Sequence, residues 1–394
     1  MKTTKAVILA GGRGERMVPL TDLMPKALIP IQGRPILAHQ LEQLERLEFK
    51  EVYILTGYLS EAIESFCNSF LSSISIKCIA SDANLSPAGR LLASKEDIGI
   101  DFLLIYCDNY VLSDDAIRQI LDVESDLTFL VEPRVEGNVE ILPDGRTLYE
   151  SGPRDKKNRW VELGNISVHS QDFFQILEEQ NDLPNTLDKF SKTHSCGHVE
   201  LIGDYWSISN FSRFLSLQAN RSILLLDRDG VLLAKMPKRE YVTNFLQYQP
   251  LIENWIGLRN LSLAGFDFIV ATNQPGVATG AVSEEFLNKL HRKMVSELLE
   301  FGINVLAVYV CPHHWEANCD CRKPNPGMLL SAISDFELDP NKTLYIGDDD
   351  RDLKAAEAAG IPGILIGQEH SHHTIFPDVT SALTAIKNIV IRVD

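Results

Sequence analysis

The sequence contains no long hydrophobic run, and its basic residues are outnumbered by acidic ones. No apolar stretch approaches the roughly 18 residues that a membrane-spanning helix needs, so no membrane partner is expected. The short apolar run near the start passes directly into glycines, which predicts a first strand rather than a signal peptide. The formal net charge of −17 argues against a general nucleic-acid binder. Small anionic ligands remain compatible with it, because a glycine loop and a few basic side chains can hold phosphates.

Cysteines are also few, and the seven present are unevenly spread. An odd number without regular spacing favours free thiols in a reducing compartment over a disulfide framework, so a cytoplasmic location is expected. Neither an internal repeat nor a low-complexity linker is visible. With 394 residues, 45% of them hydrophobic, the chain is long enough for two globular domains. The oligomeric state is left open, and a homo-oligomer is compatible with the sequence.

Short β-branched runs alternate with helical patterns along most of the chain, which is typical of α/β proteins with mostly parallel sheets. In the first part, strands are expected over residues 6–12, 51–57, 101–108 and 127–133. A later Asp144–Gly145 pair predicts a hairpin. The alternation then restarts, with strands expected over residues 222–230, 266–274, 305–311, 343–350 and 363–367. We therefore expect two domains, residues 1–219 and residues 220–394.

The first chemical motif, "LAGGRGERMVPLTDLMPK", follows the first expected strand. Its glycines form a turn in which backbone N–H groups can approach phosphates, because no side chain blocks them. Arg16 and Lys26 supply fixed positive charge for a triphosphate and its transition state. The residues expected to contact the nucleotide here are Leu9, Ala10, Gly11, Gly12 and Gly14.

This string resembles the signature of the sugar-1-phosphate nucleotidyltransferases, and the resemblance covers about residues 5–214. It implies a Rossmann-like sheet on which a sugar-phosphate oxygen attacks the α-phosphorus of a nucleoside triphosphate (NTP) and pyrophosphate leaves. Arg16 and Lys26 match the family's catalytic pair. The other implied contacts are Ala88 and Gly89 near the nucleoside, Asp108 as a Mg²⁺ carboxylate, and Glu162 and Gly164 at the sugar.

Two positions depart from that family. Pro87 stands where a threonine is usual, and Ser207 stands where a second metal carboxylate is usual. Three explanations are open for Ser207. Asp204 replaces the missing carboxylate, or Asp108 holds the metal together with water and substrate phosphates, or the domain has lost its activity. Mg²⁺ tolerates few protein ligands, because phosphates supply the others.

The second chemical motif, "LLLDRDGVL", places Asp227 and Asp229 two residues apart at the end of an expected strand. One carboxylate can attack phosphorus, and the other can protonate the leaving oxygen and later activate water. Thr272 and Lys323 can bind phosphoryl oxygens, and Asp348 can hold a metal. Because the carboxyl ends of parallel strands share one edge of a sheet, these groups should meet there. Mg²⁺ is expected on Asp227, Asp229 and Asp348.

This set of residues resembles the haloacid-dehalogenase-like (HAD-like) phosphatases over about residues 222–367. The resemblance implies a doubly wound parallel sheet and a phosphorylated Asp227. The intervals from Asp227 to Thr272 and on to Lys323 leave no room for a large cap domain, so an open, loop-shaped site is expected. Asn273 and Arg322 are expected to contact the substrate.

A cluster of soft ligands precedes the lysine of this motif, in "CPHHWEANCDCRKPNPGM". One imidazole and three thiolates form a closed four-ligand Zn²⁺ site with no position for a catalytic water. The predicted ligands are Cys311, His313, Cys319 and Cys321. Because the loop ends at Lys323, the predicted zinc is structural and fixes the catalytic lysine.

The cysteine–histidine pattern is similar to that of the D-glycero-D-manno-heptose 1,7-bisphosphate phosphatases and, less closely, of the histidinol-phosphate phosphatases. Thr279 and Asp349 depart from the usual residues of these families. Together the two resemblances imply a bifunctional enzyme that makes an NDP-heptose, with GTP favoured as the NTP and Mg²⁺ at both sites. Its partners would be small molecules, an NTP and a sugar phosphate. The alternatives are a CDP-linked or other sugar product, a histidinol phosphatase, and a phosphatase joined to a non-catalytic nucleotide-binding module.

Overall fold

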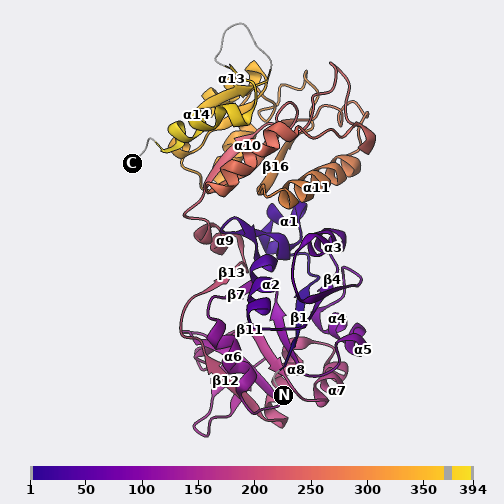
Figure 1. Ribbon diagram of the computed structural model, residues 1–394, viewed down its shortest axis with the longest axis vertical. Coiled ribbons are helices and arrows are strands. Elements are labelled where there is room, and N and C mark those ends of the chain that lie inside the picture. The colour runs from indigo at the N-terminus through magenta and orange to yellow at the C-terminus, as the bar shows by residue number, and fades with distance from the viewer. Residues whose placement is uncertain (1–2, 368–374, 392–394) are drawn as a thin grey trace. The chain divides into compact units, whose positions relative to one another are not determined.

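The computed structural model describes residues 3–367 and 375–391, which form two compact units (Figure 1). The first unit takes in most of the chain up to Phe214. The second runs from Leu215 onward and also includes two short segments, Asp22–Met24 and Pro30–Arg34. Within the described ranges, no helix is both long and apolar enough to cross a membrane.

The first unit is built on a nine-stranded mixed sheet. Its strands are β1 (Lys5–Ala10), β4 (Glu51–Thr56), β5 (Ser75–Ala80), β6 (Phe102–Tyr106), β8 (Leu127–Pro133), β9 (Val139–Ile141), β10 (Thr147–Tyr149), β11 (Trp160–Val168) and β12 (Cys196–Glu200). The main order is β10-β9-β11-β6-β1-β4-β5, and β8 pairs with β11 and β12. Strand β1 runs parallel to both β4 and β6, whereas β11 runs antiparallel to β6.

Helices and short ladders complete the first half of the chain. The helices are α1 (Leu20–Leu23), α2 (Ile36–Arg46), α3 (Ser60–Ser69), α4 (Pro87–Ala93), α5 (Lys95–Ile98), α6 (Asp114–Asp122), α7 (Asp172–Gln180), α8 (Leu183–Thr193) and α9 (Phe211–Leu217). Two further ladders pair β2 (Pro30–Ile31) with β3 (Arg34–Pro35), and β7 (Asn109–Val111) with β13 (Tyr205–Ser207).

The core of the first unit explains why its central strands read as continuous apolar runs. Strands β1, β4 and β6 are buried along almost their whole length, as expected for strands covered on both faces. Helix α6 packs on β8 and β12, and α7 packs on α8. The ring of Phe173 meets those of Phe102 and Phe190 edge to face in the main hydrophobic cluster.

The second unit is a parallel sheet with the order β16-β15-β14-β17-β18-β19. Its strands are β14 (Ser222–Leu226), β15 (Phe266–Asn273), β16 (Val305–Cys311), β17 (Tyr345–Gly347), β18 (Gly363–Ile366) and β19 (Ile375–Phe376). The helices are α10 (Ile252–Leu263), α11 (Glu284–Glu300), α12 (Gly327–Asp335), α13 (Asp350–Ala358) and α14 (Val379–Ile391). The strand order reverses direction between β14 and β17, and ligands bind at such a point in open α/β sheets.

The structure confirms the predicted α/β class. Each predicted strand overlaps an observed one, and the Asp144–Gly145 turn joins the antiparallel pair β9 and β10. The first sheet is mixed rather than mostly parallel, because the hairpin and β11 enter it antiparallel. The second sheet has no inserted cap domain in its described residues. Residues 227–251 contain only the 3-10 turn Phe245–Gln247 and isolated bridges, and residues 274–323 contain only α11 and β16.

Candidate functional site

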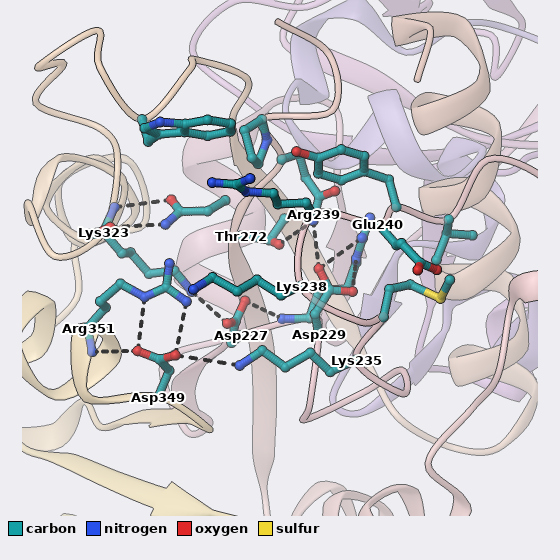
Figure 2. A pocket seen from close by; sticks show the side chains of 18 of the residues that line it. Asp227, Asp229, Lys235, Lys238, Arg239, Glu240, Thr272, Lys323, Asp349 and Arg351 are labelled. Carbon is teal, nitrogen blue, oxygen red and sulfur yellow. Dashed lines mark hydrogen bonds and ion pairs between the residues drawn. The ribbon is translucent and has the colours of Figure 1, made fainter. Parts of the chain in front are cut away.

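Polar side chains from separate strand ends meet at the carboxyl edge of the second sheet (Figure 2). Asp227 follows β14 directly, Thr272 is the next-to-last residue of β15, and Asp348 follows β17. Lys323 arrives on the loop after β16. All but Asp348 line one cavity of about 670 Å³. The sequence prediction that these groups meet therefore agrees with the geometry.

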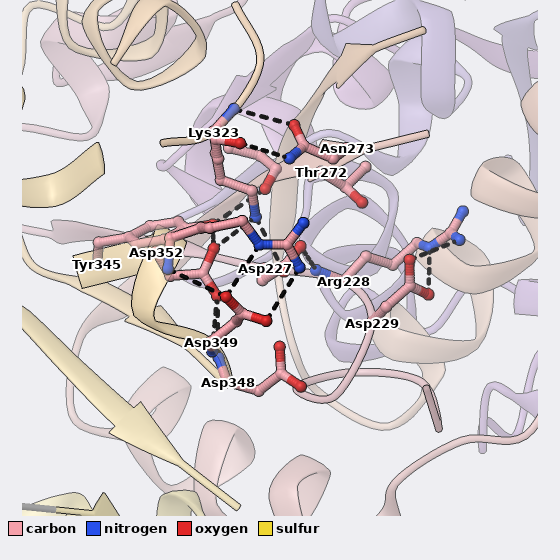
Figure 3. A network of polar contacts seen from close by, with 12 residues as sticks. Asp227, Arg228, Asp229, Thr272, Asn273, Lys323, Tyr345, Asp348, Asp349 and Asp352 are labelled. Atoms are coloured by element: carbon pink, nitrogen blue, oxygen red, sulfur yellow. Dashed lines mark hydrogen bonds and ion pairs between the residues drawn. The ribbon is translucent and has the colours of Figure 1, made fainter. Parts of the chain in front are cut away.

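Lys323 lies at the centre of this group (Figure 3). Its Nζ is 2.9 Å from Oδ2 of Asp227 and 2.8 Å from Oδ1 of Asp352. It also donates a hydrogen bond to the Tyr345 hydroxyl at 2.7 Å. Burial raises the pKa of Asp227 to about 7, although the lysine opposes that rise. One buried cation thus serves two buried carboxylates.

Asp229 lies in a separate hydrogen-bonded set. Arg228 donates to both of its carboxylate oxygens, from Nε at 3.0 Å and from Nη2 at 2.9 Å. Gln274 donates to Oδ2 of Asp229 and to the Thr272 hydroxyl, each at 2.8 Å. The guanidinium of Arg228 is itself 3.1 Å from Nε2 of the buried His291. The carboxylate of Asp229 is therefore fixed beside the threonine.

Three carboxylates form a group that can hold a cation: the ligand oxygens of Asp227, Asp348 and Asp352 lie within 4.8 Å of one another. Oδ1 of Asp348 is buried and receives no hydrogen bond from the described residues. Clustered carboxylate oxygens with an unsatisfied acceptor fit a hard divalent cation. The structure places Asp352 in this group, whereas Asp229 lies outside it.

Gly230 makes room for the carboxylate of Asp348. It has a φ of +86°, and a Cβ there would lie 2.2 Å from Oδ2 of Asp348. The same oxygen accepts a hydrogen bond from Lys235 at 2.7 Å. Any larger residue at position 230 would displace a proposed metal ligand.

The additional charge of Asp349 is neutralised within the site. Arg351 donates to its two oxygens at 2.9 and 3.0 Å, and this pairing holds the pKa of Asp349 well below its usual range. Figure 2 shows Arg351 and Lys235 on either side of this carboxylate. Asp349 also caps α13 by accepting the N–H of Arg351. The departure at position 349 thus brings a guanidinium into the cavity lining.

The two predicted substrate contacts of this cavity differ in their surroundings. Arg322 lines the cavity and donates to the backbone carbonyl of His313. Asn273 accepts the Lys323 N–H at 3.1 Å and donates to the Lys323 carbonyl at 3.0 Å. Its amide therefore ties the lysine loop to β15.

The four predicted zinc ligands converge. The Sγ of Cys319 is 3.6 Å from that of Cys311 and 3.5 Å from that of Cys321, and Nδ1 of His313 is 3.2 Å from the Cys321 sulfur. Tetrahedral Zn²⁺ bonds to sulfur at about 2.3 Å, which places neighbouring ligand atoms roughly 3.5–3.8 Å apart. The donor set and its spacing therefore fit zinc. His314 stacks on Trp315 instead.

The glycine loop of the first unit borders a second cavity of about 820 Å³. Of the predicted residues, those that line it are Leu9, Gly11, Gly12, Gly14, Arg16, Lys26 and Asp108. Lys26 Nζ is 2.6 Å from Oδ2 of Asp108. Ala10 and Ala88 are buried, and of the "PAG" stretch only Pro87 lies in the cavity lining.

Glu162 and Gly164 lie outside this lining. Glu162 is buried and accepts the N–H of Gly164, and burial raises its pKa to about 7. Gly164 has a φ of +78°, and a Cβ there would lie 2.8 Å from the Asn109 amide. Gly164 thus lies against Asn109, the neighbour of Asp108, and a sugar contact by Glu162 or Gly164 stays a prediction.

The structure also bears on the three explanations for Ser207. Ser207 lies in β13 and pairs across the ladder with Asn109 of β7, next to Asp108, and Arg213 donates to the Ser207 hydroxyl at 3.3 Å. Asp204 lies three residues away, opposite Leu112. A strand rises about 3.3 Å per residue, so Asp204 is roughly 10 Å from the required place. Asp108 belongs to no group of three or more potential ligands within the described part of the chain.

Comparisons with known proteins give a family match in each half of the chain. Residues 6–150 match the MobA-like NTP transferase domain, and residues 320–382 match a HAD-hydrolase-like family. A D-glycero-beta-D-manno-heptose-1,7-bisphosphate 7-phosphatase of Pasteurella multocida is 35% identical over 152 residues, which cover 37% of this chain and 81% of the relative. The chain belongs to the HAD-like phosphatases through its second unit.

Relatives of the HAD-like unit act on different anomers of the heptose bisphosphate, according to their names. A D-glycero-alpha-D-manno-heptose-1,7-bisphosphate 7-phosphatase of Photorhabdus laumondii is 32% identical over 154 residues, covering 37% of this chain and 82% of that protein. A D,D-heptose 1,7-bisphosphate phosphatase from B. bronchiseptica, solved with magnesium and phosphate, is 28% identical with a TM-score of 0.38, covering 42% of this chain and 97% of that one. Both anomers thus occur among the relatives.

The chain therefore joins an NTP transferase domain to a HAD-like phosphatase unit. Sequence reasoning overlooked several residues of the two sites: Asp352, Gln274, Arg351 and Arg90. Asp352 was detectable, because it lies four residues after Asp348 and one helical turn returns it to the same side. Gln274 and Arg90 depend on contacts between distant segments, whereas Arg351 pairs with Asp349, only two residues away.

Proposed function

We propose that the chain makes a nucleotide-activated heptose in two successive reactions. The phosphatase domain, residues 220–394, would remove the 7-phosphate of D-glycero-D-manno-heptose 1,7-bisphosphate. The transferase domain, residues 1–219, would join the resulting heptose 1-phosphate to an NTP. The observation that carries this proposal is the pairing of the two domains. The relatives of the second release a sugar 1-phosphate, which is what a sugar-1-phosphate nucleotidyltransferase consumes.

In the phosphatase reaction, a carboxylate oxygen of Asp227 attacks phosphorus and the bond to the sugar oxygen breaks. Asp229 donates its proton to that oxygen, which leaves as a hydroxyl. Asp229 then takes a proton from water, whose oxygen attacks the aspartyl-phosphate and releases inorganic phosphate. Thr272 and Lys323 hold the phosphoryl oxygens. Mg²⁺ bound by Asp227, Asp348 and Asp352 would offset the repulsion between the nucleophile and the phosphate.

Zn²⁺ bound by the cysteine–histidine cluster would be structural. Its four protein ligands leave no position for a reacting water. The cluster ends directly before Arg322 and Lys323, and the Asn273 amide makes two hydrogen bonds to the backbone of Lys323 in the same loop. Cys311, His313, Cys319 and Cys321 would thus hold a metal that fixes the loop of the proposed catalytic Lys323.

In the transferase reaction, an oxygen of the sugar phosphate attacks the α-phosphorus and pyrophosphate leaves. Arg16 and Lys26 line the cavity and would neutralise the developing charge. Asp108 would hold Mg²⁺, which supplies further positive charge to the phosphates. GTP is the NTP that we propose, on the resemblance of the first domain.

A second candidate has its own observation. Ser207 carries no charge, Arg213 donates to its hydroxyl, and Asp204 lies too far away to replace the missing carboxylate. The first domain would then bind a nucleotide without transferring it, and the chain would be a phosphatase with a regulatory module.

The test uses heptose 1-phosphate in both anomeric forms, supplied directly with Mg²⁺ and each of the four NTPs. Pyrophosphate release with one NTP, lost in Asp108→Asn, supports the transferase and identifies the base. If nucleotide binds without any pyrophosphate release, the binding module is the correct reading. Phosphate release from the two anomers of the bisphosphate separately identifies the phosphatase substrate.

A further inference from the structure

Arg90 lies beside the glycine loop, in the lining of the cavity of the first unit. It belongs to α4 and is only 3% exposed. Its Nη2 donates to the carbonyl oxygens of Gly11 at 2.8 Å and Ala83 at 3.0 Å. Its Nη1 donates to the Ser81 hydroxyl at 3.2 Å and to the Asp82 carbonyl at 3.0 Å. One guanidinium thus makes four hydrogen bonds inside the cavity wall.

These partners belong to two separate loops. Gly11 follows β1, whereas residues 81–83 follow β5, and both loops line the cavity together with Arg90. The fit is close, since a Cβ on Gly11 would lie 1.9 Å from Nε of Arg90. Arg90 therefore links the glycine loop to the loop after β5, and both loops line the same cavity.

The contact also fixes the direction of a loop N–H group. The Gly11 carbonyl accepts hydrogen bonds from Arg90 and from the Tyr58 N–H, the latter at 3.0 Å. In a planar trans peptide the next N–H points opposite to the carbonyl. The Gly12 N–H is therefore directed away from Arg90, and Gly12 itself is exposed, with no heavy atom within 4 Å of where its Cβ would be. A phosphate oxygen can approach there.

The charge of Arg90 acts on the same region. All four of its hydrogen bonds go to neutral oxygens. Burial lowers the pKa of Arg90, and the charge of Asp82 only partly opposes that shift. A buried cation without a contacting anion is unfavourable, and an anion bound nearby relieves that cost. A phosphate group in the adjoining cavity would supply this anion.

We propose that Arg90 is a positioning residue for the phosphates of the nucleotide. It holds the glycine loop in its binding geometry and adds a buried positive charge behind it. This inference rests on the proposed function, in which the first domain binds an NTP.

The experiment measures equilibrium binding of GTP and of guanosine to the full chain, with the other three NTP–nucleoside pairs in parallel. In Arg90→Gln, the Kd for the NTP should rise at least about tenfold, whereas the Kd for the nucleoside should change less than about twofold. Arg90→Lys keeps the charge and should recover part of the loss. Arg118→Ala removes an exposed arginine of the same unit and should change neither constant.

Phosphate release by the second unit serves as the internal measure of an intact chain. The inference is overturned if Arg90→Gln binds the NTP as tightly as the parent. It is also overturned if NTP and nucleoside weaken equally, because Arg90 would then only maintain the cavity. Should the glutamine variant fail to fold, the same ratio in Arg90→Lys decides. A parent chain that binds no NTP would overturn both this inference and the proposed transferase.

Discussion

Replacing Lys323 by methionine should destabilise the second unit and abolish phosphate release. The side chain is almost fully buried, and its ammonium contacts the carboxylates of Asp227 and Asp352 at 2.9 and 2.8 Å. Methionine matches the length of the stem but leaves both carboxylates without their cation. Removing one partner of a buried ion pair costs about 3–5 kcal/mol of unfolding free energy. In a domain of this size that corresponds to a fall in melting temperature of about 6–20 °C.

Hydrogen exchange in β14 and β17 measures this loss without interference from the first unit. Asp352→Asn in the Lys323→Met background should restore part of the stability, because it removes one of the two unpaired charges. Lys354→Met, an exposed lysine on α13, is the matched control and should change the free energy by less than about 0.5 kcal/mol. If the free energy of opening of these strands in Lys323→Met differed from that of the parent by less than about 1 kcal/mol, the reasoning on the buried ion pairs would be refuted.

Three further predictions concern separate parts of the chain. Cys319→Ser should lose the bound zinc, measured by atomic emission. Its rate of phosphate release should fall at least about tenfold, and its rate of pyrophosphate release should stay unchanged. Burial raises the pKa of Glu162 from 4.5 to about 7. Relative to Glu162→Gln, the parent should therefore lose about 3 kcal/mol of stability as the pH rises between those values, measured by urea unfolding; a pH-independent difference would contradict this. Gly230→Ala should lower phosphate release on the order of a hundredfold, because its Cβ would displace Asp348; full activity would show that the loop can yield.

The strands and the strand-end chemistry could be predicted because their signals are local. Buried strands of parallel sheets are continuous apolar runs, and a polar residue at the end of each marks the carboxyl edge. Asp227, Thr272 and Lys323 were assigned in this way, and the zinc cluster was visible within eleven residues of sequence. The structure brings each of these sets together.

What the sequence could not predict depends on contacts between distant segments. Arg90 and Gly11 are 79 positions apart, and nothing near either residue indicates the other. Glu162 lies on β11, outside the lining of the glycine-loop cavity, and the sequence around Glu162 does not indicate this. The carboxylate of Asp229 was expected on the metal, but its orientation is set by Arg228 and Gln274, and only the second of these is distant in sequence.

The central claim is that the phosphatase supplies the substrate of the transferase. The most direct test supplies heptose 1,7-bisphosphate, Mg²⁺ and the NTP to the parent chain and to Asp227→Asn, and measures phosphate and pyrophosphate together. The account predicts that the parent releases both and that Asp227→Asn releases neither, while added heptose 1-phosphate restores pyrophosphate alone. Pyrophosphate release from the bisphosphate by Asp227→Asn would contradict it, because the transferase would then not depend on the phosphatase.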